Sequence, residues 1–149
     1  MAQASSTTNA YWQHGKRGHL RLISDVAAND SDKTLTVPAG KVWEVLWMSC
    51  SLATTADVGN RVMSILVGDG TSTVGYCKAA DVQAASGTEY YNFGGYGTAS
   101  ESPATYHFIP LPQYILPAAY TLRVYDSAAI AAAGDDLTIY AMVAEYDAN

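Results

Sequence analysis

Charged residues are scarce in this sequence of 149 residues. Asp, Glu, Lys and Arg make up 15% of it, against 49% for hydrophobic residues. This composition excludes a disordered chain, and it leaves much of the surface to Ser, Thr, Gly, Ala and Tyr. Low surface charge favours a protein that packs against others. One domain of this length buries roughly 70% of its unfolded surface, so it needs no disulfide or metal to fold.

Long apolar runs are also missing. No stretch reaches the roughly eighteen apolar residues of a spanning helix. The start "MAQASSTTNAYWQ" lacks the positive segment and apolar run of a secretory signal. We therefore expect a soluble protein that is made in the cytoplasm and has no membrane partner. Cys50 and Cys77 lie in strand-like segments, where thiols are typically small buried hydrophobic groups, and a disulfide between them stays open.

Acidic residues are absent from the first 24 residues, which contain Lys16, Arg17 and Arg21. The rest of the chain has five basic and fourteen acidic residues, so the formal net charge of the whole is −6. An acidic body repels a phosphate backbone, and we expect no direct contact with nucleic acid. The basic start can still contact an acidic surface.

Paired histidines, which metal-dependent jelly-roll enzymes need, do not occur. The three histidines are His14, His19 and His107, and no two of them have His-x-His or His-x3-His spacing. His107, inside "TYHFI", is therefore interpreted as a structural or surface residue and not as a ligand. No metal site is expected.

Other catalytic patterns are missing as well. Asp30 with Asp32, and Asp135 with Asp136, resemble fragments of a calcium loop, but both lack its glycine and distal glutamate. Side chains that stabilise turns explain them equally well. There is no Gly-x-Ser-x-Gly and no phosphate-binding glycine loop. We expect no enzyme, no catalytic residues and no cofactor.

Residues 1–18 show neither helical nor strand periodicity and predict an extended N-terminal arm. Burying Tyr11 and Trp12 contributes roughly 3 to 6 kcal/mol, whereas ordering ten backbone residues costs about 10 kcal/mol or more. The arm is therefore either disordered or held by backbone hydrogen bonds to the edge of a neighbouring sheet.

From His19 onward, short β-type runs alternate with turn residues, which predicts an all-β fold. The expected domain, residues 19–149, is an antiparallel β-sandwich, jelly-roll-like with about eight strands. "GDG" between two of the runs indicates a tight hairpin. The predicted strands have the sequences "HLRLI", "KTLTV", "KVWEVLWMSCSLA", "RVMSILV", "STVGYCKA", "TYHFIPL", "YTLRVYD" and "DLTIYAMVAEY".

The strongest strand is Lys41–Ala53. Its even positions are apolar except for Glu44, which predicts one face in the core throughout. Its odd positions are apolar in the first half and then serine, as expected of a strand whose other face is covered at one end.

The aromatic stretch "TEYYNFGGYGT" lies in a region, residues 79–103, whose weak periodicity predicts a long surface excursion. Three interpretations stay open. Its rings contact another subunit or partner, cap the domain's own open end, or form a ligand site.

Two longer segments, "VPAGKVWEVLWMSCSLATTADVGNR" and "LPAAYTLRVYDSAAIAAAGDDLTIYAMVAEYD", resemble small β-rich virion proteins of tailed bacteriophages, of the head decoration or cement type. The shared features are a Pro-Ala-Gly turn into a strand with tryptophan and an Asp-Asp start of the last strand. The resemblance implies a jelly-roll protein, commonly a homotrimer, on the outer surface of the capsid. There it would bridge neighbouring major capsid protein subunits and stabilise the shell.

The sequence thus predicts a non-enzymatic virion structural protein, and the alternative is a carbohydrate- or receptor-binding module of a phage tail or fibre. A hydrolase with an unrecognised site is a third class, for which the sequence names no substrate. The candidate partner-binding residues are Tyr11, Trp12, Lys16, Arg17, Tyr90, Tyr91, Phe93 and Tyr96.

Overall fold

Strands and the loops between them make up the described part of the chain. The computed structural model describes residues 10–13, 16–95 and 104–148, and these contain eleven strands and no helix. The all-β prediction is therefore confirmed. The strands are β1 (Ala10–Gln13), β2 (Lys16–Asp25), β3 (Asp32–Thr36), β4 (Lys41–Ala53), β5 (Met63–Gly68), β6 (Thr73–Lys78), β7 (Thr88–Gly94), β8 (Tyr106–Pro110), β9 (Tyr114–Leu116), β10 (Thr121–Asp126) and β11 (Asp136–Asp147).

All eight predicted segments form strands, and the three additional strands are β1, β7 and β9. The predicted tight hairpin joins β5 to β6, and the Asp69 carboxylate accepts hydrogen bonds from the backbone N–H groups of Thr71 and Ser72 in its turn. Cys50 and Cys77 are both free thiols, so the open question of a disulfide is answered.

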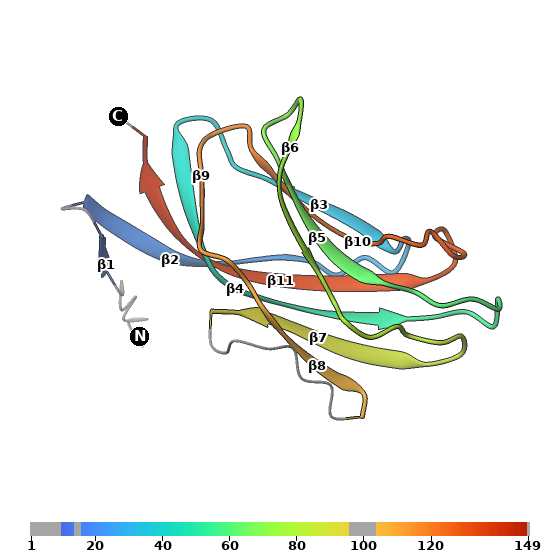
Figure 1. Cartoon of the computed structure of the whole chain (residues 1–149). Helices are drawn as coiled ribbons and strands as arrows, with labels where there is room; N and C mark the ends of the chain where they lie inside the picture. Colours follow the sequence, from blue (N-terminus) through green and yellow to red (C-terminus); the bar gives the residue numbers. More distant parts are fainter. Residues whose placement is uncertain (1–9, 14–15, 96–103, 149) are drawn as a thin grey trace, which may run out of the picture.

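The strands form two sheets, an arrangement consistent with a β-sandwich (Figure 1). The larger sheet has seven strands in the order β1-β2-β11-β4-β7-β8, with β9 also paired to β4. The smaller sheet has the order β3-β10-β5-β6. One pair departs from the predicted antiparallel pattern, because β7 and β8 run parallel. A parallel pair requires a crossover between its strands.

The core lies between the two sheets, and both contribute side chains to one buried cluster. Met48, Leu52 and Ile139 come from the larger sheet, and Ile65 and Leu122 from the smaller one. Each such side chain contributes roughly 1.5 to 3 kcal/mol when it leaves water. Because successive side chains of a strand point to opposite faces, the larger sheet also has an outer face, which the smaller sheet does not cover.

A bulge in β4 changes which of its residues face the core. Trp47 pairs with Met142 of β11 and Val45 pairs with Val143, so Leu46 is an extra residue without a partner in the ladder. An extra residue shifts the alternation by one position. Before the bulge, Trp43 and Val45 at odd positions belong to the core cluster, and after it Met48, Cys50 and Leu52 at even positions do. The expectation that one set of alternate residues lines the core throughout is therefore wrong.

Part of the predicted N-terminal arm forms a hairpin. Residues 10–13 pair with residues 16–19, and β2 continues along β11. The predicted boundary at Gly18 falls inside β2, and backbone hydrogen bonds connect this hairpin to the edge of the larger sheet. Residues 1–9 lie outside the described residues.

Candidate interaction surface

Exposed aromatic and aliphatic side chains gather on the outer face of the larger sheet, the face turned away from the core. Successive residues of a strand point to opposite faces, so a buried residue is followed by one on this outer face. The large side chains here that are at least 39% exposed are Leu20, Leu22, Trp47, Tyr90, Tyr106, Phe108, Ile115 and Tyr140.

The strand register arranges the middle of this outer face in three rows that cross β11, β4, β7 and β8, and the first two rows also reach β2. The first row is Leu22, Met142, Trp47, Gly94 and Pro110; the second is Ser24, Tyr140, Ser49, Asn92 and Phe108; the third is Thr138, Ser51, Tyr90 and Tyr106. None of these residues is charged. The formal charge of the chain therefore lies elsewhere.

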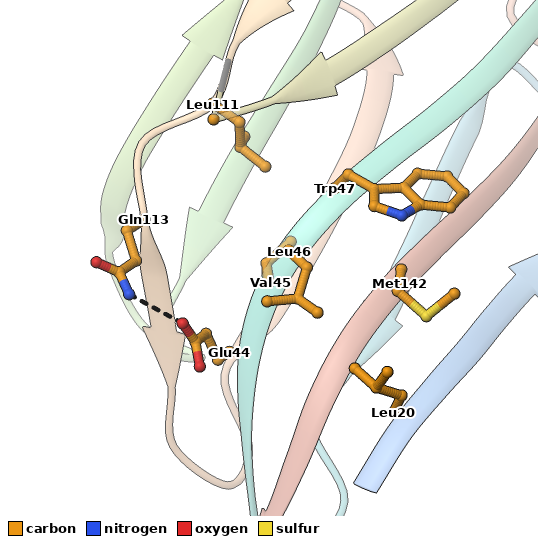
Figure 2. Close-up of a pocket in the computed structure, with 9 residues that line it drawn as sticks. Leu20, Glu44, Val45, Leu46, Trp47, Leu111, Gln113 and Met142 are labelled. Carbon is orange, nitrogen blue, oxygen red and sulfur yellow. Dashed lines mark hydrogen bonds between the residues drawn. The ribbon is translucent and has the colours of Figure 1, made fainter. Parts of the chain in front are cut away.

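An apolar groove of about 720 Å³ runs along one half of this outer face. Figure 2 shows Leu20, Met142 and Trp47 on three neighbouring strands, beside the bulged residue Leu46. The bulge forms the β4 side of the groove, because it turns two successive large residues, Leu46 and Trp47, to the outer face. We call this site the groove; its lining residues are Leu20, Glu44, Val45, Leu46, Trp47, Gly95, Leu111, Gln113 and Met142.

The one carboxylate that lines the groove is already engaged. Glu44 is 3% exposed, and its carboxylate accepts hydrogen bonds from the Gln113 amide at 2.9 Å and the Tyr146 hydroxyl at 3.2 Å. Figure 2 marks the bond to Gln113. The groove therefore presents hydrophobic side chains with a satisfied polar group at its end.

The aromatic stretch is divided between the two faces of the sheet. The structure places Tyr90 on the outer face at 42% exposure, whereas Tyr91 and Phe93 are buried at 0% and 1%. The predicted surface excursion is wrong at this point, because β7 pairs with β4 and β8 inside the sheet. Tyr91 and Phe93 are thus core residues that a partner cannot reach. Tyr96 lies outside the described residues.

The remaining candidates lie on the N-terminal hairpin. Tyr11 and Trp12 are in β1, and Lys16 and Arg17 begin β2. The backbone register places the hairpin at the sheet edge, and Leu20 farther along β2 lines the groove. The hairpin and the groove therefore belong to the same end of the larger sheet.

Sequence reasoning missed most of the surface. Trp47, Met142, Tyr106 and Tyr140 come from segments that are distant in sequence or in register, and the pairing of β4 with β11 brings the first two together. One available signal was the outward set of β11, Thr138, Tyr140 and Met142, which is uncharged where a solvent-facing strand usually has charge.

Buried polar groups elsewhere stabilise the fold. His107 is 4% exposed, contacts Glu89 through its ring nitrogen Nε2, and stacks on Tyr91 with ring centroids 4.6 Å apart. Arg61 and Asp135 form a fully buried ion pair. Burial alone would raise the pKa of Asp135, but hydrogen bonds from Arg61 and Thr55 hold it below its ordinary value. These contacts are internal to the fold.

The acidic pairs differ in role. The Asp30 carboxylate accepts a hydrogen bond of 2.7 Å from the backbone N–H of Asp32, which is a turn-stabilising contact. Asp135 instead binds Arg61 across the fold. Within residues 10–13, 16–95 and 104–148, no three His, Cys, Asp or Glu side chains gather as a metal ion would require.

Two comparisons with known proteins found no match to this chain. No protein-family model matches the chain, and a search of curated proteins finds none with significant similarity. The described residues include no helix long and apolar enough to cross a membrane.

Proposed function

We propose that this chain is a non-enzymatic structural protein of a tailed-bacteriophage virion, which binds the outside of the assembled capsid and bridges neighbouring major capsid protein subunits. The observation that carries the proposal is the apolar half of the outer face formed by the groove with Leu22, where the one carboxylate, that of Glu44, is bonded to Gln113 and Tyr146. The phage context comes from the sequence resemblance.

The charge pattern supports a protein partner. Desolvating a charge is costly, and interface cores are accordingly depleted in charged residues and enriched in Trp, Tyr, Phe and Met. Contiguous exposed apolar patches on soluble proteins mark interaction sites. In a chain of net charge −6, the row through Trp47 and Met142 is where another protein docks without burying a charge.

The N-terminal hairpin adds a second contact in this proposal. Lys16 and Arg17 begin β2, near the edge of the sheet that contains the groove, so their positive charge would be attracted to an acidic shell while the groove takes an apolar side chain. Assembly as a homotrimer, with a jelly-roll-like sandwich in each subunit, multiplies these contacts into avidity.

Stabilisation of the capsid follows from linkage. A protein that binds the assembled shell but not the free subunits lowers the free energy of the shell relative to that of the subunits. At a concentration of 100 times the dissociation constant, each occupied site adds about 2.7 kcal/mol. No chemical step is assigned to the groove, because its carboxylate, Glu44, is bonded to Gln113 and Tyr146.

Co-sedimentation with bare mature capsids tests the proposal. The protein should sediment with the particles and raise their melting temperature, and a Trp47→Ser, Met142→Ser double variant should do neither. Val74→Ser is the matched control, since Val74 is 51% exposed on β6 of the other sheet. Failure of the unmodified protein to bind capsids would refute the proposal, as would equal binding by the double variant. The solution mass of the protein alone tests the trimer.

The alternative, a carbohydrate- or receptor-binding module of a phage tail or fibre, is favoured by one specific observation. Tyrosine side chains surround a depression on the other half of the outer face. Its chemistry points to a ligand different from that of the groove.

A further inference from the structure

A shallow depression of about 230 Å³ lies on the larger sheet beyond the row of Trp47 and Met142. Its far end is four residues farther along β4, which corresponds to about 13 Å of extended strand. The lining residues are Ser49, Cys50, Ser51, Tyr90, Asn92, Tyr106, Thr138 and Tyr140. The depression and the groove have no lining residue in common.

Two aromatic walls bound the depression. On one side the rings of Tyr90 and Tyr106 stack on each other, with centroids 5.1 Å apart and an angle of 16° between their planes. On the other side stands Tyr140 of β11. Strand β4 runs between the walls, and two strand spacings separate β11 from β7, or roughly 9 to 10 Å. That width admits one six-membered ring.

The floor is small and polar. Ser49 and Ser51 are the outward residues of β4 here, and their short side chains leave the space between the walls open. The Ser51 hydroxyl is 2.7 Å from the Thr138 hydroxyl. Asn92 adds an amide with two donor hydrogens and an acceptor oxygen. Within the described residues, neither Ser49 nor Asn92 uses its side chain in a hydrogen bond to another residue, so both are available to a ligand.

Charge determines which ligand fits. No Asp, Glu, Lys, Arg or His lines the depression, and the row beyond it starts with Asp136, which would repel an anionic ligand. Aromatic walls favour a ligand with an apolar face, and hydroxyl and amide groups favour one with hydroxyls at its rim. A pyranose ring has both, because its C–H groups form a face and its hydroxyls project from the edge.

We propose that the depression between Tyr140 and the Tyr90–Tyr106 stack binds one pyranose unit of a neutral glycan. The sugar lies over Ser49 and Ser51, with an apolar face against a tyrosine ring and its hydroxyls bonded to Asn92 and the serines. This inference is independent of the capsid-binding proposal, since it uses other residues, and it names the ligand of the alternative function. It gives a capsid-bound protein a means of holding glycans near the particle.

The test titrates the full chain with the methyl glycosides of glucose, galactose, mannose and N-acetylglucosamine, followed by calorimetry and tyrosine fluorescence. At least one should bind with a dissociation constant of about 1 mM or tighter. Tyr106→Ala and Tyr140→Ala should each weaken that binding at least tenfold, and Asn92→Ala should weaken it too. Val74→Ser should leave it unchanged. Sialyllactose, which is anionic, should bind more weakly than lactose.

Several outcomes would overturn the inference. One is the absence of binding by all four neutral glycosides, and another is equal binding by the unmodified protein and both tyrosine variants. A third is loss of capsid co-sedimentation in Tyr106→Ala, which would assign the depression to protein contact. Because the glycoside titration uses no capsids, its result can still be interpreted if the capsid proposal fails. Melting temperatures of the variants, expected within a few degrees of the unmodified protein, show that the variants fold.

Discussion

Trp47 of β4 and Met142 of β11 lie directly opposite each other on the outer face, and the register shifts immediately beyond them at Val143. The shift leaves Leu46 unpaired, so that Leu46 and Trp47 both turn to the outer face while Val45 and Met48 on either side are buried. A local irregularity in one strand thus creates the surface that we propose for capsid binding.

Replacing the two tryptophans of β4 should change the unfolding free energy by very different amounts. Trp43 is 3% exposed and donates a hydrogen bond of 2.8 Å from its Nε1 to Glu145, whereas Trp47 is 39% exposed. Trp43→Ala should cost about 3 to 5 kcal/mol of unfolding free energy, because it opens a cavity. Trp47→Ala should cost about 1 kcal/mol or less and weaken capsid binding. Urea unfolding of both variants checks this, and similar losses would mean that the bulge is misplaced.

The buried ion pair should be costly to break from one side. Arg61 and Asp135 are both fully buried, and Arg61 also donates hydrogen bonds to the carbonyls of Asp57 and Gly59. Arg61→Met should destabilise the protein by about 3 to 5 kcal/mol, since it leaves an uncompensated buried carboxylate. Adding Asp135→Leu should restore part of that loss. Additive losses in chemical denaturation would contradict this coupling.

Two adjacent tyrosines should differ in their sensitivity to loss of the hydroxyl. The Tyr91 hydroxyl donates to the buried Gln83 side chain at 3.1 Å, whereas Tyr90 projects from the outer face. Tyr91→Phe should cost about 1 to 3 kcal/mol, because it leaves the amide oxygen of Gln83 unsatisfied. Tyr90→Phe should change the unfolding free energy by less than about 0.5 kcal/mol. Thermal unfolding of the two variants distinguishes them, and a reversed order would place β7 with the wrong face inward.

Acid should destabilise the fold through Asp135 and Glu145. Burial raises the pKa of Glu145, but hydrogen bonds from Trp43 and Arg21 outweigh it, and the pKa lies below its ordinary value, as for Asp135. A lowered pKa in the folded state contributes stability that is present above the unfolded value, about 4. That stability is lost as the pH falls through the folded value.

The measurement is the unfolding free energy between pH 7 and pH 2. It should fall most steeply below about pH 4, and Glu145→Gln should have a shallower slope there, because its side chain no longer takes up a proton. The amide oxygen that this substitution introduces can still accept the hydrogen bond from Trp43. Identical slopes for the two proteins would exclude Glu145 as a contributor.

The sequence determined the class of fold and the main strands. Period-two alternation and turn residues predicted eight strands, and the bounds of β4, Lys41–Ala53, agree with the structure. Such features are local, since a strand of alternating residues buries one face whatever its neighbours are. The resemblance to phage decoration proteins and the trimer remain predictions, and so does the absence of catalysis.

The tertiary structure alone decided which side chains are available to a partner. The bulge at Leu46 reverses the alternation within β4. The sequence of β4 by itself does not predict this bulge, because the extra residue is defined only by the pairing with β11. Likewise, β7 is a central strand because β4 and β8 flank it, which buries Tyr91 and leaves Tyr90 outside. A surface assembled from five strands depends on long-range register, and register is a property of pairs of strands.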